Sequence, residues 1–261
     1  ILYSNFYPNN IPAFDIIKLM IRLIYNLITI LFITLLSVSC VNKPKENGVE
    51  EEYKKAIKLI KNSNFTECAN KFNEITEEFP FSSWAKEAKI LASYCYYKDQ
   101  SYPETIDLTE DYINSYPSDK NVVYMQYLRS LSYYKQMPDI SRSQDDSKMS
   151  FYGFKDIISR DSGSIHAKDA IKKIKKINEN IAGYYMEIGR FYQKKEDYVG
   201  AINNFNYVIN SYSFTEQYPE ALYRIYAIYY KLGMLDESKK AKNNLLGLKG
   251  ADKWIKYLSK D

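Results

Sequence analysis

Residues 185–205 read YMEIGRFYQKKEDYVGAINNF, and this stretch decides the fold. Large and small side chains recur in it at Tyr185, Ile188, Gly189, Tyr192, Ala201 and Phe205. Spacings of three and four residues bring side chains onto one face of a helix. Small residues on that face let two antiparallel helices approach closely, and aromatic rings fill the space between them. The stretch therefore predicts a packed pair of helices.

The second helix of this pair lies between two aromatic residues that are fourteen positions apart, and the same interval recurs along the chain. It separates Phe65 from Phe79, Tyr102 from Tyr116, and Tyr198 from Tyr212. The first two copies are offset by thirty-seven residues, and Leu235 restarts the pattern thirty-seven residues after Tyr198. The period and the residue pattern resemble tetratricopeptide repeats. We expect an all-α fold, an α-solenoid of about five tetratricopeptide helix pairs.

The expected helices cover 50–62 and 65–79, 82–98 and 102–116, 120–135 and 147–159, 167–194 and 198–212, and 219–231 and 235–245. The third pair is irregular, because Pro138 cannot continue a helix and residues 139–146 are polar except for Ile140. A long connection of this kind is often a binding feature. Residues 167–194 fit one helix or two helices broken near Gly183. The open end of the stack is expected to carry an apolar cap, formed by Trp254, Tyr257 and Leu258.

The composition argues against a nucleic-acid or metal protein. Of the 261 residues, 27 are Tyr, whose ring packs while its hydroxyl stays in water. Thirty-six basic residues nearly balance thirty-two acidic ones, so no nucleic-acid-binding surface stands out. The most basic run, from Lys172 to Lys176, is interpreted as a solvated helix face. Three Cys and one His form no metal or redox motif, so no cofactor or metal is expected.

Cys68 and Cys95 are expected at core-type positions. Between copies, Cys68 aligns with Ala201, and Cys95 aligns with Phe191 and Ile228. We expect both to be buried thiols that pack as small apolar groups. A Cys68–Cys95 disulfide is the alternative, because the two residues lie on adjacent copies and an oxidising compartment would permit it.

The N-terminal stretch resembles a secretory signal. After Met20 a basic residue is followed by an apolar run over 23–36 and by small residues before Cys40. This run is short for a membrane span, which needs about 20 apolar residues. We expect residues 1–39 to be a signal peptide. Residues 1–19 lack this pattern, so Met20 is the expected true start and these residues lie upstream of it.

A cut before Cys40 resembles the lipobox of bacterial lipoproteins, although Leu36 lies one place earlier than that pattern prefers. The resemblance implies lipid attachment at Cys40, a lipidated tether over 40–49, and a solenoid with its C-terminal cap over 50–261. Each buried CH₂ contributes about 0.8 kcal/mol, so a multiply acylated cysteine would hold the chain on a bilayer. Val41 replaces the Asp that retains such lipoproteins at the inner membrane, which implies the periplasmic face of the outer membrane.

The sequence shows no catalytic constellation. His166 lies beside an expected helix start and has no paired carboxylate nearby, so a helix-start or solvated role is favoured over general-base catalysis. There is no phosphate-binding loop, no Gly-x-Ser-x-Gly motif and no metal-ligand cluster in the sequence. We therefore expect a protein that is not an enzyme.

Three stretches resemble the BamD family, the tetratricopeptide lipoproteins of the outer-membrane β-barrel assembly machinery. They are FPF at 79–81 with Trp84 and YCYYK at 94–98, YMQYLR at 124–129 with PDISRSQ at 138–144, and AGYYMEIGR at 182–190 with Tyr198 and AIN at 201–203. The resemblance extends from Ala56 to Tyr257. The chain departs from the family at Ser130, Ser143 and Asp161, and Asn204 stands where many members carry Arg.

The resemblance implies a scaffold subunit of the β-barrel assembly (BAM) complex that binds a BamA-type barrel protein, other BAM lipoproteins and unfolded outer-membrane proteins. The first pairs would hold a groove for C-terminal segments of these substrates, with candidate residues Phe81, Trp84, Tyr97, Tyr124 and Arg129. Aromatic rings offer contact area at low entropy cost, and an Arg binds a terminal carboxylate through two hydrogen bonds. The last pairs would dock on the BamA-type protein through a face that includes Asn203 and Asn204.

A second hypothesis keeps the anchor and the repeats but assigns the chain to the cell-wall or division machinery, as an outer-membrane-anchored tetratricopeptide adaptor. Both hypotheses use the same fold, so the repeat pattern does not distinguish them. Depletion of the protein does, because barrel proteins should vanish from the outer membrane only if the chain serves their assembly.

Overall fold

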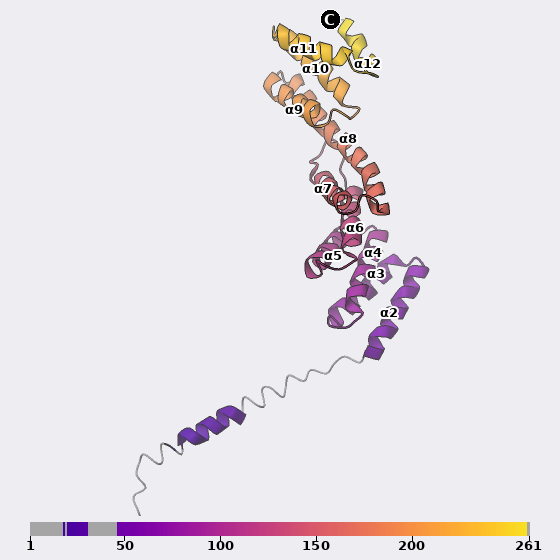
Figure 1. Cartoon of the computed structure of the whole chain (residues 1–261), viewed down its shortest axis with the longest axis vertical. Helices are drawn as coiled ribbons and strands as arrows, with labels where there is room; N and C mark the ends of the chain where they lie inside the picture. Colours follow the sequence, from indigo (N-terminus) through magenta and orange to yellow (C-terminus); the bar gives the residue numbers. More distant parts are fainter. Residues whose placement is uncertain (1–17, 19, 31–45, 260–261) are drawn as a thin grey trace, which may run out of the picture. The chain divides into compact units, whose positions relative to one another are not determined.

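The computed structural model describes residue 18 and residues 20–30 and 46–259 (Figure 1). The chain divides into two compact units, residues 1–48 and residues 49–261. In the first unit, residues 20–30 form a helix. None of the described helices combines the length and the apolar character that crossing a bilayer requires. Cys40 and most of the tether lie outside the described residues, so the signal peptide, the start site and the lipid attachment stay predictions.

Residues 46–259 are built from helices, and this part of the chain contains no strand. Five helix pairs follow one another: α2 (Glu46–Lys61) and α3 (Phe65–Glu78), α4 (Ala85–Lys98) and α5 (Tyr102–Ser115), α6 (Val122–Lys135) and α7 (Asp145–Arg160), α8 (Ile165–Lys194) and α9 (Tyr198–Ser211), and α10 (Tyr218–Lys231) and α11 (Leu235–Leu246). A short α12 (Asp252–Ile255) and a 3-10 turn, η1 (Lys256–Ser259), follow. From α3 to α11 each helix packs on the next (Figure 1), which confirms the predicted all-α solenoid.

One turn joins the two helices of every regular pair. At its centre lies a residue with a positive φ angle, namely Ser63, Gln100, Glu196 or Gly233. The N–H of the next residue donates to the carbonyl five positions earlier, as in 64 to 59, 101 to 96, 197 to 192 and 234 to 229. This Schellman arrangement ends the first helix and satisfies its last carbonyls. Only one of the four central residues is glycine, so the backbone hydrogen bonds and not a particular side chain define this turn.

The aromatic residue at the end of α3, α5 and α9 is a cap and not a helical residue. Phe79, Tyr116 and Tyr212 have φ angles of −130°, −132° and −133°, and each donates its N–H to the carbonyl four positions earlier. The helices predicted to end at these residues therefore end one position earlier. The extended cap turns the chain toward the next pair, so the aromatic spacing in the sequence marks a bend in the backbone.

Some helix starts also differ from the expectation, because polar side chains there form turns. α4 begins at Ala85 and not at Ser82, whose hydroxyl accepts the N–H of Ala85 at 3.1 Å. α7 begins at Asp145, so Asp145 and Asp146 belong to its first turn and not to the polar loop. Carboxylates are stabilised there by the positive end of the helix dipole.

The stretch that predicted the fold forms a close contact between α8 and α9. A Cβ atom on Gly189 would lie 2.5 Å from Cε1 of Phe205, so only glycine leaves room for this buried ring. Buried apolar residues of α8 to α11 continue this core, and at the chain's end Leu258 is buried in it while Trp254 packs against it. The Tyr257 ring lies 5.7 Å from that of Trp254, which places the three predicted cap residues together.

The connection between α6 and α7, residues 136–144, is held by side chains. Gln144 is fully buried, and its Nε2 donates to the carbonyl oxygens of Asp139 and Arg142 at 3.0 and 2.9 Å. Its Oε1 accepts the hydroxyl of Ser147 at 2.7 Å. One amide side chain thus satisfies the backbone of a long loop, which explains how nine residues outside a helix keep a fixed path.

Two contacts fix this connection to α8. Asn180 donates from Nδ2 to Oε1 of Gln144 at 2.6 Å and to the carbonyl oxygen of Pro138 at 2.9 Å. A Cβ atom on Gly183 would lie 3.1 Å from Cγ2 of Ile140, so Ile140 rests on the glycine. α8 is a single helix of 30 residues, and Gly183 makes room for the loop instead of breaking the helix.

Cys68 of α3 and Cys95 of α4 form a disulfide, with Cα atoms 5.9 Å apart and both residues fully buried. The favoured expectation of two free thiols is therefore wrong, and the alternative is confirmed. Comparison of the copies placed both cysteines in the core correctly. It did not show that they face each other, because that depends on how the second helix of one pair meets the first helix of the next.

Candidate functional site

Partly exposed aromatic side chains lie across three neighbouring helices, and we call them the tyrosine face. It comprises Tyr94 and Tyr97 of α4, Tyr124 and Tyr127 of α6, and His166 of α8. The His166 ring lies 4.3 Å from the Tyr127 ring and 6.1 Å from the Tyr124 ring. α4 contacts α6, and α6 contacts α8, because first helices of successive pairs line one side of a solenoid.

Burial disfavours ionisation of two tyrosines on this face. Burial raises the pKa of Tyr124 to about 12, and the neighbouring tyrosines add to the shift. Burial raises the pKa of Tyr97 as well. At the edge of the face, Tyr127 donates its hydroxyl to Asp169 at 2.5 Å, and Lys173 donates to the same carboxylate at 2.8 Å. Burial opposes ionisation of Asp169, but these two donors prevail and its pKa lies below the usual value.

The structure brings together only part of the predicted groove. Tyr97 and Tyr124 meet on the tyrosine face, where each affects the ionisation of its neighbours. Arg129 follows Tyr124 by five residues, which turns it about 140° around α6. It lies beside Tyr133, among acidic residues of α5 and α7. Arg129 therefore does not share a surface with the two tyrosines.

Phe81 and Trp84 lie in the turn between α3 and α4. Phe81 is fully exposed, with an accessible fraction of 101%. The Trp84 ring packs 4.7 Å from the ring of Tyr53 and against the core between α2 and α4. Trp84 is thus mainly a core residue, whereas Phe81 offers an unsupported ring at the edge of the first pair.

The two predicted docking residues differ in their surroundings. Asn203 is exposed on α9. Asn204 is half-buried, and its Nδ2 donates to the carbonyl oxygen of Gly200 at 2.8 Å within the same helix. Of the two predicted docking residues, Asn203 is therefore the more exposed.

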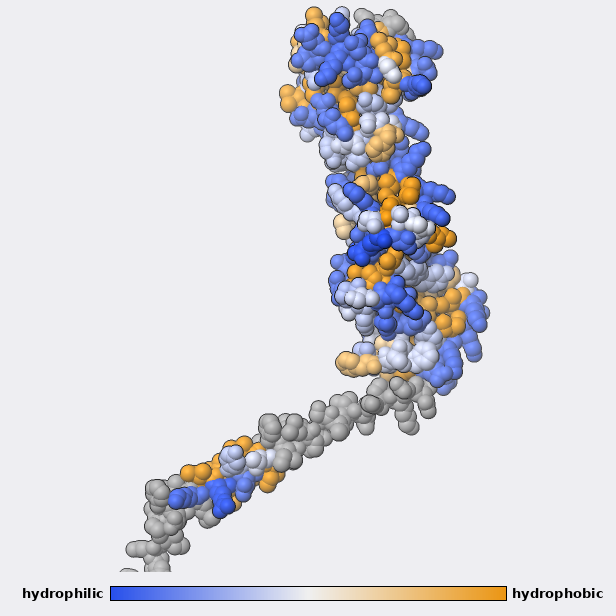
Figure 2. Space-filling model, viewed as in Figure 1, coloured by the Kyte–Doolittle hydropathy of each residue, from blue (hydrophilic) through white to orange (hydrophobic). Residues whose placement is uncertain are grey.

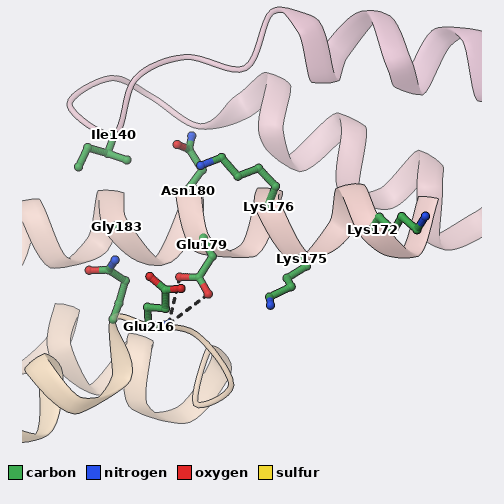
Figure 3. Close-up of a pocket in the computed structure, with 9 residues that line it drawn as sticks. Ile140, Lys172, Lys175, Lys176, Glu179, Asn180, Gly183 and Glu216 are labelled. Carbon is green, nitrogen blue, oxygen red and sulfur yellow. Dashed lines mark hydrogen bonds between the residues drawn. The ribbon is translucent and has the colours of Figure 1, made fainter. Parts of the chain in front are cut away.

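Two recesses flank Ile140, where the connection between α6 and α7 rests on α8. The first, which we call the basic recess, has a volume of about 440 Å³ and lies between α8 and the turn before α10 (Figure 3). Its polar lining residues are Lys172, Lys175, Lys176, Glu179, Asn180, Glu216 and Gln217. The carboxylate of Glu179 accepts the N–H of Glu216 at 3.1 Å to each oxygen. Burial raises the pKa of Glu179.

The second recess lies on the other side of Ile140, and we call it the aromatic recess. Its volume is about 390 Å³, and it is lined by Ile140, Ser141, Tyr184, Glu187, Ile188, Phe191 and Tyr192. Phe191, which aligned with core-type positions in the sequence, has 58% of its surface exposed. The expectation of a core position is wrong for Phe191, which lines this recess instead.

Sequence reasoning missed three members of the tyrosine face. Tyr94 and Tyr127 each lie three residues from a predicted groove residue, so helical spacing alone was enough to find them. His166 was assigned to a helix start, and it does lie in the first turn of α8. Its contact with Tyr127 depends on α8 beginning at Ile165, before the expected residue 167, and no pattern in the sequence revealed this. Within the described residues, no group of three His, Cys, Asp or Glu side chains is arranged to hold a metal ion.

Stacked helix pairs with an aromatic face and charged recesses define a tetratricopeptide-type scaffold. On the face shown in Figure 2, hydrophilic side chains cover much of these helices and hydrophobic patches lie between them. The family described as YfiO, outer membrane lipoprotein, matches residues 45–245, and the chain belongs to this family.

Curated relatives carry one common description. A protein of Rickettsia prowazekii (strain Madrid E), an outer membrane protein assembly factor BamD, is 32% identical over 233 residues, which cover 87% of this chain and 92% of the relative. The BamD of Caulobacter vibrioides is 30% identical over 75% of this chain and 64% of the relative. The BamD of Neisseria gonorrhoeae is 27% identical over 71% of this chain and 73% of the relative.

Proposed function

We propose that this chain is a non-catalytic scaffold subunit of the outer-membrane β-barrel assembly machinery. It holds a BamA-type barrel protein, other assembly lipoproteins and unfolded outer-membrane proteins together at the periplasmic face of the outer membrane. A lipid on Cys40 anchors it there. The observation that carries the proposal is the similarity to the assembly factor of Rickettsia prowazekii, which extends over 92% of that relative.

The tyrosine face supports a role in holding unfolded substrates. Its rings are fixed by contacts with neighbouring helices, so binding costs little side-chain entropy. Burial raises the pKa of Tyr97 and Tyr124, which disfavours a tyrosinate charge at these two positions. The C-terminal segments of barrel proteins alternate apolar and polar residues, and an aromatic face suits such an extended chain.

The disulfide supports an oxidising compartment. Cys68 and Cys95 are both fully buried, and their bond joins the first two helix pairs. Structural disulfides persist in the periplasm and are rare in the cytosol. The covalent link is therefore consistent with export of the helical unit across the inner membrane.

Photocrosslinking tests the substrate part of the proposal. A photoreactive amino acid at Tyr97 or Tyr124 should crosslink to unfolded barrel proteins in cells, and one at Lys240, an exposed position of α11, should not. Equal crosslinking at all three positions would show that the tyrosine face has no special role. The photoreactive amino acid at position 203, in place of Asn203, should crosslink to the BamA-type protein. If the BamA-type protein is crosslinked only from Tyr97, the assignment of the two surfaces would be reversed.

Two further measurements test the machinery and the anchor. Depletion of the chain should remove barrel proteins from the outer membrane, and defects confined to cell division would support the adaptor hypothesis instead. The Cys40→Ser variant should lose the acyl chains that mass spectrometry detects on the parent and should leave the membrane fraction. Retention of the variant in that fraction would contradict anchoring through Cys40.

A further inference from the structure

Three lysines of the basic recess form no salt bridge in the described part of the chain, although their neighbour Lys173 forms one. Lys175 and Lys176 still act on Glu179 through their charge, which opposes the rise of its pKa. Lys173 forms a salt bridge with Asp169 at 2.7 Å. Among residues 46–259, Lys172, Lys175 and Lys176 form no salt bridge within 4.0 Å. The sequence alone suggested a solvated helix face for this run. The fold instead places the three side chains in the lining of a concavity.

The concavity also contains hydrogen-bond acceptors. Figure 3 shows the tip of Lys176 beside Asn180, and the tip of Lys175 on the side of α8 where Glu216 lies. The Glu179 carboxylate already accepts one backbone N–H, that of Glu216, with both of its oxygens. Each carboxylate oxygen has a further lone pair, so this group is able to accept a second backbone N–H from a bound chain.

We infer that the basic recess binds an extended acidic segment of a partner protein. The segment's carboxylates face Lys172, Lys175 and Lys176, and its backbone N–H groups face Glu179 and Glu216. The chain then passes over Ile140 and places an apolar side chain in the aromatic recess beside Ile188. This surface is separate from the tyrosine face and from Asn203.

The mixed charge of the recess favours a peptide over a lipid surface. An anionic bilayer presents phosphate acceptors to the lysines, but it offers few donors to Glu179 and Glu216. A peptide supplies both carboxylates and N–H donors. The two recesses also match a peptide in length. From Lys176 to Ile188 the helix rises about 18 Å, which about five or six extended residues would span.

A direct binding measurement tests the inference on the purified full chain. The probe is a fluorescein-labelled nonapeptide with three acidic residues at one end and three apolar residues at the other, and the control peptide carries Gln in place of the acidic residues. The triple variant Lys172→Glu, Lys175→Glu and Lys176→Glu should weaken binding of the acidic probe by about tenfold or more, as should raising the salt concentration. The matched variant Lys239→Glu, Lys240→Glu and Lys249→Glu has the same net charge and should bind like the parent.

Further arms separate the possible outcomes. Ile188→Ser should weaken binding of the probe but leave its salt dependence unchanged. If charge reversal disturbs the circular dichroism spectrum, the triple Lys→Gln variant replaces it, and it should still weaken binding several-fold. Equal affinity for the two peptides, or equal loss in both triple-glutamate variants, would overturn the inference. Binding to vesicles of phosphatidylglycerol that the recess variant loses, together with unchanged peptide binding, would assign the recess to a membrane surface.

Discussion

The α6–α7 connection and the α8–α9 turn join two helices in different ways. In the α8–α9 turn, Glu196 adopts a positive φ and two backbone hydrogen bonds close the first helix. In the α6–α7 connection the N–H groups of Gln136 and Met137 close α6, and the side chain of Gln144 holds the loop that follows. The helix packing differs as well. The aromatic ring of Phe205 fills the space at Gly189, whereas a Cβ on Gly153 of α7 would meet the polar hydroxyl of Ser130.

The two types of helix pair therefore depend on different parts of the chain for their structure. The turn of a regular pair is made by the backbone, so residues as different as Ser63, Gln100 and Glu196 occupy its centre. The third pair depends on particular polar side chains, and Ser147 and Ser150 are fully buried there with hydrogen bonds. A regular pair should therefore tolerate exchange of its turn residues, whereas the third pair should not.

Loss of the disulfide should have the largest effect, and it should stay within the first two pairs. The bond closes a loop of 27 residues, so the double variant Cys68→Ala and Cys95→Ala should lower the local free energy of unfolding by about 3 kcal/mol. Native-state hydrogen exchange measures this for amides of α3 and α4. A solenoid helix contacts only its neighbours, so amides of α10 serve as the internal control, and equal losses there would contradict local stabilisation.

Gln144→Leu should destabilise the irregular third pair, because it leaves polar groups of the connection without a hydrogen-bond partner. The leucine has nearly the same size but leaves the carbonyls of Asp139 and Arg142 and the amide of Asn180 without this partner. We expect the free energy of unfolding to fall by about 2–3 kcal/mol, measured by urea denaturation. Arg142→Ala removes an exposed side chain of the same loop and keeps its carbonyl, so it should cost little. A small effect of both would show that the loop does not need Gln144.

Gly189→Ala tests the regular side of the comparison. The new methyl group would meet the ring of Phe205, and overpacking should lower the free energy of unfolding by about 1–3 kcal/mol. The double variant Gly189→Ala and Phe205→Leu should recover part of the loss, since the smaller side chain clears the space. Failure of the second substitution to help would mean that the glycine serves the backbone and not the ring.

Replacing a turn residue by glycine should produce the smallest change, and it should stabilise. Gln100→Gly and Glu196→Gly each place the residue that prefers a positive φ where the chain requires it. Relief of the left-handed strain should raise the thermal midpoint modestly, by the equivalent of about 1 kcal/mol. Ala at the same positions is the control and should give no gain. Destabilisation by glycine would show that these side chains contribute more than the turn geometry suggests.

The repeat itself could be predicted because its signal is local. The spacing of Gly189, Ala201 and Phe205 sets the contact of one helix pair. The second helices that begin at Phe65 and Tyr102 repeat the interval of fourteen residues that begins at Tyr198. The interval of fourteen residues was predicted correctly, but the aromatic residues at its second end, Phe79, Tyr116 and Tyr212, were assigned to the helices. They are extended caps, since a helix and its cap differ by one backbone angle that hydrophobic spacing does not report.

The surfaces were less predictable because they combine residues from distant copies. Tyr97 and Tyr124 were proposed from the family resemblance and from their residue type, and the stacking of α4 on α6 brings them together. Arg129 was added because an Arg binds a terminal carboxylate, but its position around α6 turns it to another side. The basic recess escaped prediction, because it exists only where Ile140 and the turn before α10 approach the lysines of α8.

The 30-residue helix α8 also fixes the angle, about its own axis, between the helix pairs that precede it and those that follow it. Its first turn carries His166 of the tyrosine face, and its last turns hold α9, on which Asn203 is exposed. A rigid helix turns by about 100° and advances by about 1.5 Å for each residue. Insertion of a single alanine near its middle would therefore swing one binding surface around the axis by about a quarter of a circle, with hardly any change in the distance between the two. Partners bound at these two proposed surfaces would no longer meet at the required angle, even though each surface kept its own structure.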